Sequence, residues 1–213
     1  MKTVSIVDYG AGNLFSVSRA FEQCGARSIL VSTAAQVEAA ECLILPGVGA
    51  FADGMAGLRK LELIGPLQNY SRQGKPFLGI CLGMQMMMEW SLEFGRHEGL
   101  GIIPGGVVPV PAHGASGAAH KVPLIGWSGL ELPHGRASWK DTMLRDTPPG
   151  TQAYFVHSFM AVPADTGHRL ADTDYDGVKI CAAIGQGRTA GCQFHPEKSG
   201  PAGLAMLRAF LNR

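Results

Sequence analysis

Cys81 stands in the segment Gly79-Ile80-Cys81-Leu82-Gly83, which joins one apolar run to another. Glycines two residues before and two residues after a nucleophile permit the sharp strand-to-helix turn of a nucleophile elbow. Such a turn exposes the sulfur, and the helix that begins there points unpaired backbone N–H groups at it, which favours the thiolate and offers a donor to an oxyanion. The spacing therefore predicts a nucleophilic thiol at Cys81. A buried core position is the alternative, which we expect for the other cysteines, Cys24, Cys42, Cys181 and Cys192.

A thiolate nucleophile needs a proton carrier, and His195-Pro196-Glu197 offers an imidazole and a carboxylate two residues apart. Residues two apart in an extended segment point the same way, so the carboxylate can orient the ring and stabilise its charged form. Pro196 restricts the backbone between them. Together with the elbow cysteine, this segment predicts a Cys-His-Glu triad. A turn histidine beside a solvated glutamate is the alternative for the tripeptide alone.

An oxyanion needs backbone donors, and the segment Pro46-Gly47-Val48-Gly49 is a candidate source. It follows a predicted strand that should lie beside the elbow strand, and glycines on both sides of Val48 let its peptide reorient. Its N–H groups could then complete an oxyanion hole with that of Leu82. An ordinary turn is the alternative.

The elements that position these residues alternate in the first half of the chain. Apolar runs predict strands at 4–7, 28–31, 42–45 and 76–80, and helical spacing predicts helices at 14–24, 34–40 and 82–90 and one or two helices over 54–73. This alternation predicts a mainly parallel sheet flanked by helices, with Cys81 at the carboxyl end of a strand, where α/β sheets bind ligands. From residue 101 on, short runs at 105–109, 124–132, 152–162 and 178–193 predict an antiparallel portion, followed by a helix at 202–211. The stretch 109–119 is predicted to be a loop.

Composition narrows the class of protein. A chain of 213 residues with 46% apolar content predicts one α/β domain over 1–213. Lys plus Arg (18) and Asp plus Glu (17) nearly cancel, so we expect no nucleic acid and no membrane as partner. Five cysteines without CxxC or zinc-like spacing favour reduced thiols in a cytoplasmic protein with no metal. Gly10-Ala11-Gly12 lacks the third glycine of a dinucleotide fingerprint, because Phe15 takes its place, so we expect no cofactor.

Several segments, taken in order, resemble a known family. They are IVDYGAGNLFSV (6–17), LPGVGAF (45–51), GICLGMQ (79–85), KVPLIGW (121–127), YFVHSF (154–159) and GCQFHPEKS (191–199). In this order they resemble the glutaminase subunit of imidazole glycerol phosphate synthase, a class I (triad) glutamine amidotransferase of histidine biosynthesis. The resemblance spans the chain and implies the flavodoxin-like α/β fold of that class.

The resemblance also implies roles for particular residues. Cys81 is then the nucleophile, His195 the general base and acid, and Glu197 the group that orients the imidazole. The oxyanion segments match Gly47, Val48, Gly49 and Leu82, and the glutamine contacts match Gln85, Glu93, His157, Ser158 and Phe159. Asn13, Trp127 and Lys198 match positions that face the synthase partner. The implied reaction converts L-glutamine to L-glutamate and passes ammonia to a (β/α)₈ cyclase within a heterodimer.

One segment departs from the family pattern. The family commonly reads KVPHMGWN where this chain has Leu124, Ile125 and Ser128, so a His and an Asn near the partner-facing rim are replaced. The departure leaves open a paralogous subunit that feeds ammonia to another acceptor, as in amidino-sugar synthesis for surface polysaccharide. A stand-alone γ-glutamyl hydrolase and a subunit without catalysis are further alternatives. The intact triad argues against the last, and Asn13, Trp127 and Lys198 argue against the hydrolase.

Overall fold

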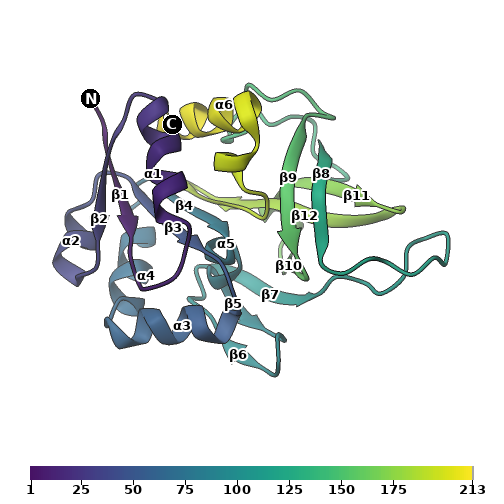
Figure 1. The fold of residues 1–213 in the computed structure, drawn as a ribbon, viewed down its shortest axis with the longest axis horizontal. Coiled ribbons are helices and arrows are strands. Elements are labelled where there is room, and N and C mark those ends of the chain that lie inside the picture. Colours follow the sequence, from purple (N-terminus) through teal and green to yellow (C-terminus); the bar gives the residue numbers. More distant parts are fainter. Residues whose placement is uncertain (213) are drawn as a thin grey trace.

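The computed structural model describes residues 1–212, which form two sheets flanked by helices (Figure 1). The large sheet has nine strands in the order β2-β1-β3-β4-β13-β12-β11-β8-β9, and the small sheet has four in the order β10-β7-β5-β6. The helices are α1 (Leu14–Gln23), α2 (Ala34–Ala39), α3 (Phe51–Lys60), α4 (Ile64–Arg72), α5 (Leu82–Met86) and α6 (Gly200–Leu211), with 3-10 turns η1 (Thr166–His168) and η2 (Pro196–Lys198). The strands are β1 (Thr3–Val7), β2 (Arg27–Val31), β3 (Leu43–Gly47), β4 (Phe77–Cys81), β5 (Met88–Ser91), β6 (His97–Glu98), β7 (Ile103–Pro109), β8 (Leu124–Glu131), β9 (Gln152–His157), β10 (Phe159–Pro163), β11 (Arg169–Tyr175), β12 (Val178–Gln186) and β13 (Thr189–Cys192).

The large sheet is parallel in one half and antiparallel in the other. β2, β1, β3, β4 and β13 run parallel, and β12, β11, β8 and β9 then alternate in direction. The mainly parallel sheet and the antiparallel portion predicted from the sequence are therefore both present. The carboxyl ends of the parallel strands β3, β4 and β13 lie at one edge, so the residues that follow these strands are brought together.

Alternating side chains of the parallel strands supply two hydrophobic clusters, one on each face of the sheet. Val4 and Ile6 of β1 pack with residues of α1 and α6, whereas Val7 packs with residues of α3 and α4. β4 is buried along its whole length, as expected for a central parallel strand covered on both faces. Figure 1 shows α1 and α6 on one side of the sheet and α2, α3 and α4 on the other.

Several predicted boundaries are wrong. The helix predicted over 82–90 ends at Met86, and Met88 begins β5, which pairs with β7 in the small sheet. An unbroken apolar run fits a buried helix and a buried strand equally well, so its period could not separate the two. The run 152–162 divides at Ser158 into β9 and β10, which enter different sheets, and 178–193 divides into the hairpin of β12 and β13.

Two further features lie outside the parallel sheet. β11 was not predicted, although it pairs with both β12 and β8. The predicted loop at 109–119 lies between β7 and β8, where one isolated bridge joins His113 to Ala119, and it stands out from the body of the fold (Figure 1). Within residues 1–212, no helix combines the length and apolar character that crossing a membrane requires.

Candidate active site

Cys81 lies at a sharp turn between β4 and α5, as the elbow spacing predicts. Its φ is +53°, a left-handed conformation that is costly for a residue with a side chain and that clusters at functional sites. Both flanking glycines are required by close backbone approach. A Cβ on Gly83 would stand 1.7 Å from the carbonyl oxygen of Leu45, and a Cβ on Gly79 would stand 2.7 Å from the nitrogen of Met84. The glycines therefore allow α5 to fold back against the strands while the Cys81 sulfur faces a pocket.

His195 and Glu197 form a buried pair at the carboxyl end of β13. His195 Nδ1 lies 2.7 Å from Glu197 Oε1, and both side chains are almost fully buried. Because a carboxylate only accepts, Nδ1 carries the proton and Nε2 is directed elsewhere. Nε2 has no hydrogen-bond partner among the described residues, and it is the ring atom left to exchange a proton with Cys81.

The charge state of His195 depends on its two neighbours. Burial alone lowers the pKa of the imidazole, because it disfavours the charged form. The interactions with Cys81 and Glu197 favour the charged form and outweigh burial, so the pKa of His195 rises to about 9. The imidazolium form of His195 is therefore favoured over the neutral range. Burial raises the pKa of Tyr9 and the neighbouring Cys81 raises it further, and the Tyr9 hydroxyl donates to the carbonyl of Pro46 at 2.9 Å.

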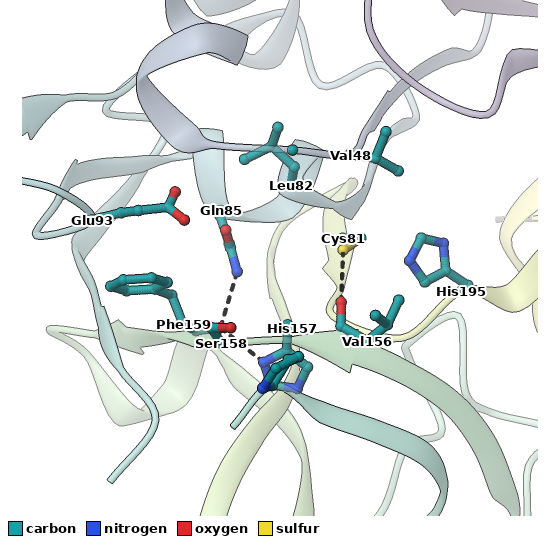
Figure 2. Close-up of a pocket in the computed structure, with 12 residues that line it drawn as sticks. Val48, Cys81, Leu82, Gln85, Glu93, Val156, His157, Ser158, Phe159 and His195 are labelled. Atoms are coloured by element: carbon teal, nitrogen blue, oxygen red, sulfur yellow. Dashed lines mark hydrogen bonds between the residues drawn. The ribbon is translucent and has the colours of Figure 1, made fainter. Parts of the chain in front are cut away.

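A pocket of about 300 Å³ opens beside the Cys81 sulfur (Figure 2). This volume is at the lower end of the range for small-molecule sites. Both Cys81 and His195 line the pocket, although Cys81 ends β4 and His195 follows β13. The other lining residues are Val48, Gly49, Leu82, Gln85, Glu93, Pro123, Val156, His157, Ser158 and Phe159.

Three of the four residues predicted to form the oxyanion hole line this pocket: Val48, Gly49 and Leu82. Leu82 is the first residue of α5, so its N–H is one of the helix's unpaired donors. Gly47 is not a lining residue. It pairs with Cys81 in the sheet, and a Cβ there would stand 2.5 Å from the Tyr9 hydroxyl oxygen, so its role is to let β3 approach the elbow.

All five predicted glutamine contacts line the pocket: Gln85, Glu93, His157, Ser158 and Phe159. Gln85 Nε2 donates to the carbonyl of Phe159 at 3.0 Å, and Glu93 Oε2 accepts the N–H of Phe51 at 2.6 Å. Glu93 thereby caps α3, since Ala50 provides no side-chain cap. These bonds fix both side chains before any ligand binds.

One ring nitrogen of the buried His157 has no hydrogen-bond partner among the described residues. Its Nδ1 lies 2.8 Å from the carbonyl of Phe159, which can only accept, so Nδ1 carries the proton. Nε2 has no partner among residues 1–212. Burial and the nearby His195 together lower the pKa of His157 to about 4, although the hydrogen bond to the Phe159 carbonyl acts in the opposite direction. The ring is therefore a neutral acceptor at pH 7.

The residues predicted to face a partner lie outside the pocket. Asn13 caps α1, because its side chain accepts the N–H of Ser16 at 3.4 Å. The ring of Tyr154 lies between the other two: its centroid is 5.9 Å from that of Trp127 and 6.0 Å from Lys198 Nζ. Trp127 is 54% exposed. Asn13 follows β1, Trp127 lies on β8 and Lys198 belongs to η2, which follows β13.

Sequence reasoning missed residues that act through long-range contacts. Pro123 and Val156 line the pocket, and Gln193 donates to the Cys81 sulfur at 3.6 Å. The motif around Gln193 was recognised, but nothing in its composition indicated that this side chain reaches the thiol. Ser128, one of the departures from the family pattern, shares a hydrogen bond of 2.6 Å with the hydroxyl of Thr173.

Comparisons with known proteins identify the family and the fold. The sequence model of the family "Glutamine amidotransferase class-I" matches residues 5–213. Among solved structures, that of PurLQS from Thermotoga maritima superposes with a TM-score of 0.74 at 20% identity, covering 99% of this chain and 98% of that one. A structure described as a glutamine amidotransferase gives a TM-score of 0.73 at 18% identity, over 98% and 97% of the two chains. The predicted fold class is confirmed.

Similarity to curated proteins shows to which subgroup of this family the chain belongs. "Imidazole glycerol phosphate synthase subunit HisH 1" of Legionella pneumophila (strain Lens) is 54% identical over 211 residues, 99% of each chain. The HisH subunit of Rhodopirellula baltica is 43% identical over 207 residues, which are 97% of this chain and 96% of that one. The chain belongs to the class I glutamine amidotransferase family and, within it, to the HisH subunits of imidazole glycerol phosphate synthase. It is therefore an enzyme of the glutaminase type that uses a cysteine nucleophile.

Proposed function

We propose that this chain is a cytoplasmic glutaminase subunit that hydrolyses L-glutamine at Cys81 and delivers the ammonia to a cyclase partner for imidazole glycerol phosphate formation in histidine biosynthesis. One observation carries the assignment of the site. The Cys81 thiol at the elbow and the buried His195–Glu197 pair line one pocket of about 300 Å³, although they come from distant parts of the chain. We propose that residues 1–213 act as a single domain in this role.

The chemistry follows from the positions of the sulfur and the imidazole. The Cys81 thiolate attacks the side-chain amide carbon of glutamine, and the carbonyl electron pair moves onto oxygen, where the N–H groups of the 48–49 segment and of Leu82 receive it. His195 then gives its Nε2 proton to the amide nitrogen, the C–N bond breaks, and ammonia leaves a thioester. Water, deprotonated by His195, attacks the thioester, and cleavage of the C–S bond releases glutamate and restores the thiolate.

Several pocket residues suit an amino-acid substrate. The Glu93 carboxylate can pair with the α-ammonium group, and the neutral His157 can accept a hydrogen bond through Nε2. Gln85 uses its Nε2 hydrogens on protein acceptors, so its Oε1 is the atom left for the ligand. We assign these residues, with Ser158 and Phe159, to glutamine binding.

The surface beside the pocket supports a protein partner. Free ammonia is protonated in bulk water at neutral pH and loses its nucleophilicity, so transfer through a water-excluding interface preserves it. Exposed apolar side chains occur on the elements that carry Asn13 and Trp127: Phe15 is 76% exposed and Ile125 is 60% exposed. We infer that a (β/α)₈ cyclase covers this surface in a heterodimer.

The paralogous alternative depends on the changes at Leu124 and Ser128. The Ser128 hydroxyl is already paired with Thr173 inside the sheet, so its difference from asparagine alters the sheet as well as the rim. The full-length relatives at 54% identity are named as imidazole glycerol phosphate synthase subunits, which supports the histidine pathway over another ammonia acceptor. The exposed apolar surface favours a partner-dependent enzyme over a stand-alone hydrolase.

Mixing the chain with candidate cyclases tests the proposal. We expect slow glutamate release from the chain alone and a marked increase with the imidazole glycerol phosphate cyclase and its nucleotide ligand. An electrophilic glutamine analogue should label Cys81 and leave the buried Cys42, the matched control, unmodified. Full glutaminase turnover in Cys81→Ala would refute the assignment of the nucleophile. Stimulation by a cyclase of another pathway, and not by this one, would refute the assignment of the acceptor.

A further inference from the structure

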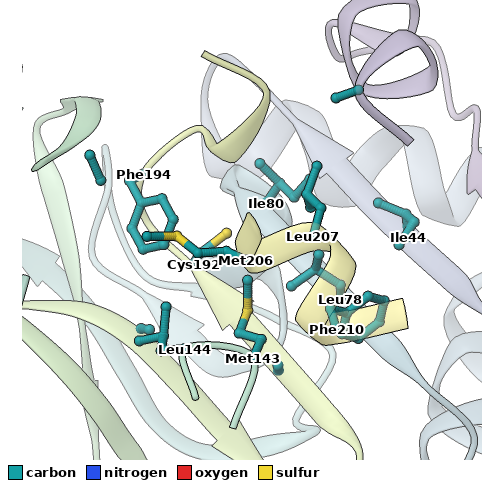
Figure 3. Close-up of a cluster of buried hydrophobic side chains, with 14 of the residues drawn as sticks. Ile44, Leu78, Ile80, Met143, Leu144, Cys192, Phe194, Met206, Leu207 and Phe210 are labelled. Atoms are coloured by element: carbon teal, nitrogen blue, oxygen red, sulfur yellow. The ribbon is translucent and has the colours of Figure 1, made fainter. Parts of the chain in front are cut away.

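Gln193 occupies the space behind the nucleophile. It follows β13 directly, and its N–H donates to the carbonyl of Ala182 at 2.9 Å, which extends the pairing with β12 by one residue. Its neighbours Cys192 and Phe194 are part of a hydrophobic cluster (Figure 3). Since side chains alternate along an extended segment, Gln193 points the other way. Its side chain is fully buried and does not line the pocket.

Both the oxygen and the nitrogen of the buried Gln193 amide form hydrogen bonds. Its Oε1 accepts from Gln85 Nε2 at 3.0 Å, and its Nε2 donates to Cys81 Sγ at 3.6 Å. A buried amide must find such partners, because each unpaired polar atom costs free energy. A purely structural amide could use any backbone group for this purpose. Here the donor end is directed at the sulfur of the nucleophile.

The direction of these bonds is set by a backbone carbonyl. Amide O and N are not distinguished by shape, so their assignment must come from the hydrogen-bond network. The carbonyl of Phe159 can only accept, so Gln85 must present its NH₂ group there. The second hydrogen of that NH₂ group then points to Gln193 Oε1, which turns Gln193 Nε2 toward the sulfur. A flipped Gln193 would place two donors face to face.

The two hydrogen-bond partners of the Cys81 sulfur favour opposite protonation states. The Cys81 thiol donates to the carbonyl of Val156 at 3.9 Å (Figure 2). This acceptor can form a hydrogen bond only while the sulfur carries its proton. Gln193 Nε2–H is a donor, so it strengthens its interaction when the sulfur becomes negative. Loss of the proton therefore exchanges the contact with Val156 for a stronger one with Gln193.

We propose that Gln193 is a positioning residue that holds the Cys81 sulfur and stabilises its thiolate by donating an amide N–H, while Gln85 and Phe159 fix the orientation of the amide. This inference rests on the proposed role of Cys81 as nucleophile. Gln193 reaches the substrate only through Cys81 and Gln85. It thus couples the charge of the nucleophile to the orientation of a side chain that lines the substrate pocket.

The pH profile of Cys81 alkylation tests this role. The rate of reaction with iodoacetamide is followed by mass spectrometry of the Cys81 peptide, in the chain alone and in Gln193→Met, which has a similar length and no donor. Loss of one hydrogen bond to a charged acceptor should move the profile to higher pH by about one unit and slow alkylation at pH 7 about tenfold. The titratable groups near the sulfur, Tyr9, His157, Cys192, His195 and Glu197, are unchanged in this variant.

Cys181→Ala is the control. It removes a buried thiol of β12 whose charged neighbours are Arg169 and Asp172, so it should lower the melting temperature without moving the alkylation profile. A profile in Gln193→Met that coincides with the wild type overturns the inference. If Gln193→Met does not fold, the side-chain amide resonances of Gln193 in the wild-type chain decide the question. They should shift when Cys81 is alkylated, and resonances that do not respond contradict the proposed contact.

Failure of the inference can be separated from failure of the proposed function. If the glutamine analogue does not label Cys81 in the wild-type chain, the nucleophile is wrongly assigned. If Cys81 is labelled and the Gln193→Met profile is unchanged, the nucleophile stands and only the role of Gln193 is wrong.

Discussion

Glu197→Gln isolates the contribution of the buried carboxylate to the triad. The substitution preserves the shape of the side chain and an oxygen that can still accept the Nδ1 proton of His195. It removes the negative charge 2.7 Å from a ring that is 2% exposed, so solvent does not replace the lost interaction. A charge-assisted hydrogen bond contributes about 1.5–3 kcal/mol, which corresponds to about 10- to 150-fold in rate.

The same substitution should change the pH dependence. The pKa of His195 is raised to about 9, and Glu197 is one of the two groups that raise it. The imidazolium is present below this pKa and is lost as the pH rises through it. Removing the carboxylate lowers the pKa, so the alkaline limb of the kcat/KM profile should move to lower pH.

Glutamate release between pH 6 and 10, at saturating and at low glutamine, measures both effects. Glu131→Gln is the control, because Glu131 forms a half-exposed ion pair with Lys179 on the surface and should leave both parameters unchanged. The reasoning is refuted if kcat of Glu197→Gln stays within about threefold of the wild type and the alkaline limb does not move, since a bond of this kind contributes more than that.

Two further predictions concern the elbow and the partner surface. Gly83→Ala places a methyl group 1.7 Å from a backbone oxygen of β3 and should cost about 3 kcal/mol, or about 6–12 °C in Tm. Gly65→Ala is the control, because this glycine lies on an exposed turn of α4 with open space around it; it should stabilise the chain by up to about 1 kcal/mol. Equal changes in Tm for the two variants in scanning calorimetry would contradict this prediction. Trp127→Ala should weaken cyclase binding about 30-fold without slowing alkylation of Cys81, whereas Leu30→Ala on the edge strand β2 should not weaken it. Equal Kd values for the two variants in titration calorimetry would contradict the proposed surface.

The chemistry of this chain could be predicted because its signals are local. The glycines around Cys81 predict a turn from a few neighbouring residues. His195 and Glu197 do form a pair, but through the 3-10 turn η2 and not through the extended segment assumed from their spacing. The alternation of strands and helices likewise placed Cys81 at the carboxyl end of a strand. Both expectations needed no knowledge of distant contacts.

The errors share a physical cause. Met88 is as apolar as Met86, and only its pairing with β7 decides that one is in a strand and the other in a helix. The break between β9 and β10 occurs at Ser158 without a glycine or proline to mark it. Gln193 and Val156 meet the sulfur through an amide and a backbone carbonyl, across more than 70 residues of sequence. Long-range register of this kind cannot be read from a single sequence.

The place of β13 beside β4 has a consequence for biosynthesis of the enzyme. β13, which precedes the proton acceptor His195, can join the sheet only after residues 189–192 have been made, whereas β4, which ends at Cys81, is complete at residue 81. A growing polypeptide on the ribosome, or a fragment cut within the β12–β13 hairpin, therefore has a cysteine but no base to deprotonate it. Under the proposed mechanism, such an incomplete chain should not hydrolyse glutamine, because it lacks the His195–Glu197 pair.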